Sequence, residues 1–159
     1  MKICFLLVLL LSTVAQANTA KILVSLTPAG SFEAVSEKLK GNLIKKDGGY
    51  SADKLWVSIE SFKTGIDLRD EHFWKHLNST KFPKAVLTNV IGKGGKATAI
   101  LEVNGVKKPI NMTYVEKSSG ITTSFQLKAS EFGLAKASYL GVGVTDDVKI
   151  EATYPFVSK

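Results

Sequence analysis

Residues 121–128 read ITTSFQLK, and the stretch alternates apolar and polar side chains toward its end. In an extended chain Phe125 and Leu127 fall on one face, whereas Gln126 and Lys128 fall on the other. A period of two is typical of a strand with one face buried and the other in water. This stretch therefore predicts a strand of an antiparallel sheet.

The same alternation occurs in residues 54–61, KLWVSIES, and in residues 147–156, DVKIEATYPF. Turn signals separate such segments: DGG at 47–49, GKGG at 92–95, NG at 104–105 and SSG at 118–120. Between residues 84 and 128 they divide the chain into consecutive short strands, which indicates an antiparallel meander. The sequence thus predicts an all-β sandwich or a closed barrel, whose closure would remove exposed strand edges.

The alternation also predicts which side chains face inward. The candidates for the interior are Leu55, Val57, Ile59, Leu101, Val103, Phe125, Leu127, Val148 and Ile150. A small barrel can either fill with such side chains or enclose one ligand, and periodicity alone leaves both open.

One segment, residues 65–87 (GIDLRDEHFWKHLNSTKFPKAVL), has a different period. Asp67 is a candidate N-cap, Asp70 adds negative charge to the first turn, and Phe73 and Leu77 lie four residues apart. We predict a short helix over residues 68–77 that ends before the proline at 83.

The predicted helix carries both histidines of the chain, His72 and His76. Their spacing of four is that of helical zinc ligands, and Asp70 or Glu71 could add a further ligand. The hydrolytic motif is absent, because Phe73 rather than glutamate follows His72. We expect no metal site, and a structural or metal-binding barrel that uses both histidines is the alternative.

The first 17 residues have the pattern of a cleaved secretory leader: Lys2, an apolar run, and a small-residue ending, AQA, at 15–17. Cleavage there would leave one domain of 142 residues, 18–159. The only cysteine, Cys4, would leave with the leader, which excludes disulfides and thiol chemistry.

The remaining chain has 20 basic and 14 acidic residues, and Arg69 is its only arginine. The lysines are scattered rather than clustered with aromatics, so we expect no nucleic-acid partner. A transient contact with an anionic membrane surface and a homodimer stay open. The chain lacks a GxSxG elbow and a phosphate-binding loop before a helix, so we expect no enzyme.

Four segments in order support a family resemblance. GIDLRDEHF at 65–73 followed by KFP at 81–83, SFKTG at 61–65, LEVNGVKKPI at 101–110 and SEFGL at 130–134 resemble motifs of the polyisoprenoid-binding YceI-like family. The first hairpin, LTPAGS at 26–31, departs from the family pattern because it lacks an acid and a histidine.

The resemblance implies a single lipocalin-like antiparallel barrel of about eight strands. It implies that the barrel encloses a long-chain lipid, such as a polyisoprenoid or an isoprenoid quinone, without a cofactor. The helix would act as a lid, and Arg69, His72 and Phe73 are the candidates for lid or head-group contacts. A bacterial periplasmic or secreted location follows from the leader and the family.

Overall fold

The computed structural model describes residues 18–118, 120–139 and 141–155, and over these residues the chain forms one antiparallel sheet of eleven strands. The predicted leader, residues 1–17, and Phe156 lie outside the described residues. The strands are β1 (Thr19–Thr27), β2 (Ser31–Ser36), β3 (Lys40–Gly41), β4 (Ile44–Lys46), β5 (Gly49–Ser58), β6 (Lys84–Lys93), β7 (Lys96–Val103), β8 (Val106–Lys117), β9 (Gly120–Lys128), β10 (Ser138–Tyr139) and β11 (Val142–Pro155). All but β3, β4 and β10 are six residues or longer, in agreement with the expected barrel of about eight strands.

The strand order is β2-β1-β11-β9-β8-β7-β6-β5-β3, with β4 paired to β5 and β10 paired to β11. Strands β6 to β9 are neighbours in chain order, which confirms the predicted meander. Asn104 and Gly105 join β7 to β8 with positive φ angles of 51° and 74°. Two successive residues with positive φ suit a tight hairpin turn, and the NG dipeptide tolerates them at low cost.

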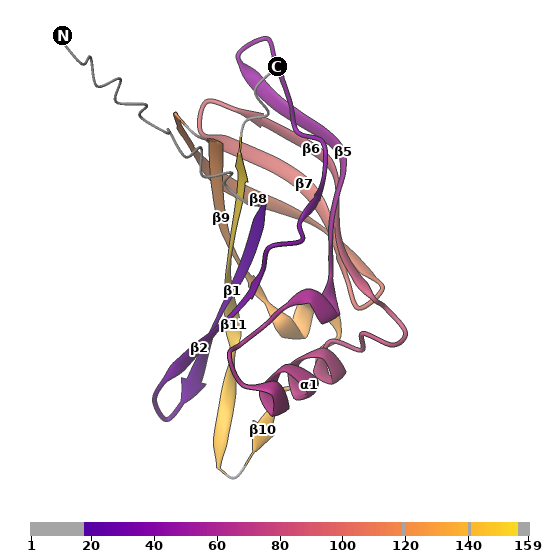
Figure 1. Ribbon diagram of the computed structural model, residues 1–159, viewed down its shortest axis with the longest axis vertical. Helices are drawn as coiled ribbons and strands as arrows, with labels where there is room; N and C mark the ends of the chain where they lie inside the picture. Colours follow the sequence, from indigo (N-terminus) through magenta and orange to yellow (C-terminus); the bar gives the residue numbers. More distant parts are fainter. Residues whose placement is uncertain (1–17, 119, 140, 156–159) are drawn as a thin grey trace, which may run out of the picture.

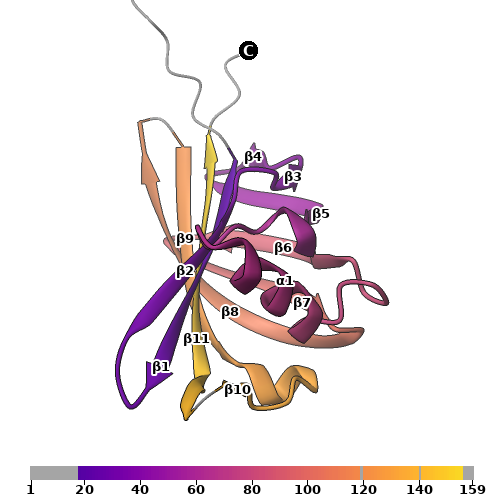
Figure 2. The same ribbon diagram turned by 60° about the horizontal axis from the view of Figure 1, so that its bottom comes forward.

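The sheet curls into a barrel, and α1 (Asp67–His76) lies across its open side (Figures 1 and 2). Strand pairing does not close the barrel, because β2 and β3 are the two ends of the sheet. Val35 of β2 and Lys63 instead exchange two backbone hydrogen bonds of 2.9 Å across the seam. The lipocalin-like barrel is confirmed, with a seam closed by a loop and a helix.

Helix α1 begins one residue before the predicted start, and the predicted cap is wrong. Ile66 occupies the N-cap position without a side-chain hydrogen bond, and Asp67 lies in the first turn, where its charge favours the helix dipole. Among the described residues no helix has the length and apolar character required to cross a bilayer.

Two short 3-10 turns, η1 (Ile59–Ser61) and η2 (Ala129–Phe132), follow β5 and β9. The prediction that Ile59 continues the strand of Leu55 and Val57 is therefore wrong. Its side chain is nevertheless 2% exposed, because the turn directs it into the core.

Candidate functional site

A cavity of about 1080 Å³ lies between the sheet and α1. Protein interiors are close-packed, and voids larger than a water molecule are few. This volume is at the upper end of the range for small-molecule sites. The barrel is therefore hollow toward α1 and leaves room for a ligand there, and that it encloses one stays a prediction.

All nine residues predicted to face inward line this cavity, from Leu55 on β5 to Ile150 on β11. For the eight that lie on strands the common orientation follows from the period of two, whereas Ile59 faces inward from η1. The structure thus brings them together around one space. That they contact a ligand stays a prediction.

Other lining residues were missed by sequence reasoning. Strand β1 contributes Ala20, Ile22, Val24 and Leu26, every second residue of TAKILVSLT, so alternation could have found them. Phe62 lies just after η1 and Phe132 lies at the end of η2. A 3-10 turn has no strand periodicity, and the sequence therefore carried no such signal for these two.

The buried carboxylate of Asp70 holds the helix to the loop before it. Its Oδ1 accepts hydrogen bonds from the backbone N and the Oγ1 of Thr64, both at 2.7 Å, and Oδ2 lies 3.4 Å from Lys63 Nζ. Burial opposes ionisation of this group, but the Thr64 bonds and the Lys63 cation outweigh burial. The pKa of Asp70 therefore lies below its ordinary value.

Two further side chains of α1 bind the same loop. Arg69 Nη2 donates to the Thr64 carbonyl at 2.7 Å, and Trp74 Nε1 donates to the Phe62 carbonyl at 3.0 Å. Lys63 in this loop is the residue that hydrogen-bonds β2 across the seam. The helix, the loop and the sheet edge are thus one connected unit, fixed by charge-assisted hydrogen bonds of Arg69 and Asp70.

Arg69 also faces the cavity. Its guanidinium carbon lies 4.8 Å from the centroid of the Phe32 ring, and the buried Nε has no hydrogen-bond partner. A buried donor without a partner costs free energy unless a water or a ligand accepts from it.

Phe73 of α1 and Leu77, which follows the helix, point toward the barrel. Phe73 packs edge to face against Phe32 and Phe62, with ring centroids 6.5 Å and 6.0 Å apart. Leu77 is 9% exposed and belongs to the core. These apolar contacts fix the inner side of the helix.

The charged and titratable side chains that line the cavity are Arg69, His72, Lys75, His76 and Lys136. No Asp or Glu is among the described residues of the lining, so the site favours an anionic or electron-rich group. Burial lowers the pKa of His76, which favours its neutral form at neutral pH.

His72 and His76 both line the cavity, as their spacing predicted. Over the described ranges, no group of three His, Cys, Asp or Glu side chains is placed to hold a metal ion.

Comparisons with known proteins agree with this geometry. The fold is similar to BcnA of Burkholderia cenocepacia (15% identity, TM-score 0.67, 86% of this chain and 94% of that one). It is similar to a polyisoprenoid-binding domain from Saccharophagus degradans implicated in plant cell wall breakdown (15% identity, TM-score 0.63, 86% of this chain and 91% of that one). A YceI protein of Campylobacter jejuni is a third such structure (17% identity, TM-score 0.60, 77% of this chain and 82% of that one).

A search of curated proteins gives no match. The model of the YceI-like domain family, in contrast, matches residues 11–156, nearly the whole sequence. The chain therefore belongs to the YceI-like domain family.

Proposed function

We propose that this protein is a carrier that encloses one long-chain isoprenoid lipid or isoprenoid quinone in the barrel. The observation that carries the proposal is the apolar cavity of about 1080 Å³, lined by side chains of seven long strands. Transfer of a hydrocarbon chain from water to such a lining is favourable by roughly 25 cal/mol per Å² of buried apolar surface. A solved domain of the same fold is named as polyisoprenoid-binding, which supports a lipid as the occupant.

The head group of the lipid would lie near α1, where Arg69 and His72 line the cavity. The Nε of Arg69 has no partner, and a carbonyl or phosphate oxygen would accept from it. The apolar tail would extend along Leu55, Leu101 and Phe125. The proposed carrier has no catalytic residue, needs no cofactor, and acts in the bacterial periplasm or the medium after export.

Native mass spectrometry followed by organic extraction tests the proposal. Protein purified from an exporting bacterial host should carry one lipid per chain, and the extract should contain an isoprenoid. Protein without lipid that instead holds one equivalent of metal would overturn the carrier and favour the histidine alternative.

A substitution sharpens this test at the head group. Arg69→Lys keeps the charge but removes the planar donor fork. We expect the variant to stay folded and to retain less lipid, because the oxygen of the head group loses its donor. Lys38→Gln, an exposed change outside the cavity lining, is the control and should leave lipid content unchanged.

A further inference from the structure

Six large apolar side chains are exposed within the described residues, and they divide into two sets. Ile66, Leu68 and Val142 are 54%, 62% and 41% exposed and also line the cavity. Ile44, Ile91 and Val115 are similarly exposed but do not line it. The first set therefore forms an apolar rim at the opening of the cavity.

The rim comes from two segments far apart in the sequence. Ile66 and Leu68 stand at the start of α1, and Val142 begins β11 just after β10. Figure 1 shows α1 and β10 at the same end of the molecule, opposite the β4–β5 turn. The exposed apolar groups thus gather on one end face.

The charged side chains that line the cavity at this face are basic. Lys75 and Lys136 are exposed, and the Arg69 guanidinium of α1 lies 4.8 Å from the centroid of the Phe32 ring. The acids nearby are Asp67 and Glu71 on α1 and Asp146, which interacts with Lys136, whereas Asp70 is engaged by Lys63. Cations around an apolar rim complement a surface with anionic head groups above hydrocarbon.

We propose that this face docks on an anionic lipid bilayer, with Ile66, Leu68 and Val142 entering the interface and Lys75 and Lys136 contacting lipid phosphates. The inference rests on the proposed carrier function, since a docked mouth lets a long-chain lipid move between bilayer and cavity without crossing water.

Vesicle co-sedimentation tests the docking. The exported protein, with its N-terminus verified by mass spectrometry, is mixed with phosphatidylcholine vesicles with or without about one third phosphatidylglycerol. We expect binding to the anionic vesicles that weakens with added salt.

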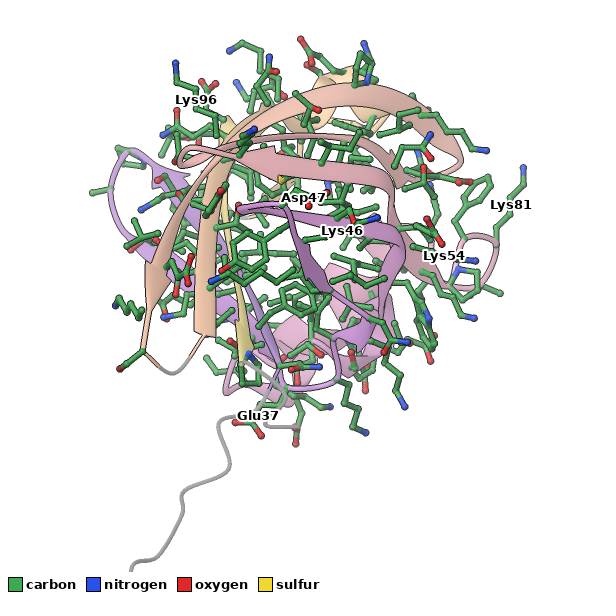
Figure 3. All side chains as sticks on the ribbon, turned by 90° about the horizontal axis from the view of Figure 1, so that it is seen from above. Glu37, Lys46, Asp47, Lys54, Lys81 and Lys96 are labelled. Atoms are coloured by element: carbon green, nitrogen blue, oxygen red, sulfur yellow. The ribbon has the colours of Figure 1, made fainter. Side chains whose placement is uncertain are left out.

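The variant Leu68→Ser/Val142→Ser should lower the partition coefficient at least about tenfold, because two apolar contacts with the interface are lost. Lys75→Gln/Lys136→Gln should lower it about 25-fold, at about fivefold per lysine. The matched controls are Ile44→Ser/Ile91→Ser and Lys46→Gln/Lys96→Gln. Lys46 and Lys96 lie on the opposite end, which Figure 3 views from above.

If the control variants reduce binding as much as the variants at the cavity opening do, docking by this face is contradicted. An absence of binding to anionic vesicles also contradicts it. Extraction of the same preparations separates the two proposals. Protein that contains lipid but binds no vesicle contradicts docking alone, whereas protein that binds through the mouth but never contains lipid contradicts the carrier.

Discussion

The two ends of the barrel share the same strands but differ in how their interiors are filled. Toward the β4–β5 turn the interior is packed, and Tyr50 and Tyr114 meet edge to face with centroids 5.6 Å apart. The packed end also contains Ala52, Val90, Ala97, Ala99 and Met112, which are buried and do not line the cavity. Toward α1 the same strands present Leu55, Leu87 and Leu101 to the cavity.

The comparison teaches that residue size alone does not decide which end is filled, because large side chains such as Tyr50 occur at the filled end and small ones such as Ala85 line the cavity. At the filled end little space is left: a Cβ on Gly92 of β6 would stand 3.0 Å from the Tyr114 ring of β8. At the hollow end Leu55, Leu87 and Leu101 are cross-strand neighbours on β5, β6 and β7, and α1 lies across the space in front of them. Large inward side chains therefore do not by themselves imply a packed core.

The largest effect is expected from adding volume at the packed end. Ala99→Trp places a large ring where the alanine is 4% exposed and surrounded by core, so native packing must shift. We expect a loss of at least about 3 kcal/mol in the free energy of unfolding, measured by urea denaturation of lipid-free protein.

Val57→Trp is the matched change at the hollow end. Val57 is 5% exposed but lines the cavity, so the ring can extend into empty space. We expect a stability change below about 1 kcal/mol and a loss of extractable lipid. Equal destabilisation by the two variants would mean that the ends do not differ.

Phe73→Ala should have the next largest effect, because the hollow end depends on few contacts between α1 and the barrel. The change removes two edge-to-face pairs and enlarges the cavity, so we expect the free energy of unfolding to fall by about 3 kcal/mol. Thermal melts would measure the loss of stability. Glu71→Ala, an exposed change on the same helix, is the control. If Phe73→Ala melts at the same midpoint temperature as wild type, the helix does not stabilise this end.

Asp70→Asn tests the clamp that holds α1 in place, namely the hydrogen bonds and the ion pair of Asp70 with Thr64 and Lys63. We expect the free energy of unfolding to fall by about 2 kcal/mol at pH 7. The folded pKa of Asp70 is lowered, so its contribution is complete above the ordinary value of about 3.9 and is lost as pH falls through the folded pKa. Urea unfolding at pH 7 and pH 3 should show a smaller difference between wild type and variant at the lower pH.

Asp146→Asn is a close control, because Asp146 accepts from the backbone N and the Oγ of Ser130 at 2.7 Å, but near the surface. We expect Asp146→Asn to lower the free energy of unfolding by less than half as much as Asp70→Asn does. A similar cost at both sites would mean that burial of the Asp70 clamp adds nothing.

Sequence reasoning found the features that repeat with a local period. Alternation identified the inward face of β9 and β11, and the NG dipeptide identified the β7–β8 turn, because each depends on neighbouring residues alone. Eight of the nine predicted interior positions could be named for the same reason, whereas Ile59 faces inward from a 3-10 turn. Alternation did not distinguish packed from hollow, since that depends on the distance between opposite walls.

Features set by tertiary contacts were not predicted. Asn89, with φ of 52°, lies at a bulge where β6 shifts register against β7, so that Leu87 and Val90 are both directed inward. No residue pattern signalled this change of face. Asp70 was likewise predicted only to interact with the helix dipole, whereas its carboxylate accepts hydrogen bonds from Thr64, which lies before the helix.

The smallest effect is expected from His72→Gln/His76→Gln. Burial lowers the folded pKa of His76, so its contribution to stability is present above the ordinary value of about 6.5 and declines as pH falls. The double variant should therefore match wild type within about 0.5 kcal/mol at pH 7 and lose less stability than wild type on acidification to pH 5. Lipid content by extraction should stay unchanged, because the cavity keeps its apolar lining and Arg69. If metal analysis instead finds one equivalent of zinc in wild type and none in the variant, the hollow end is a metal site rather than a lipid cavity.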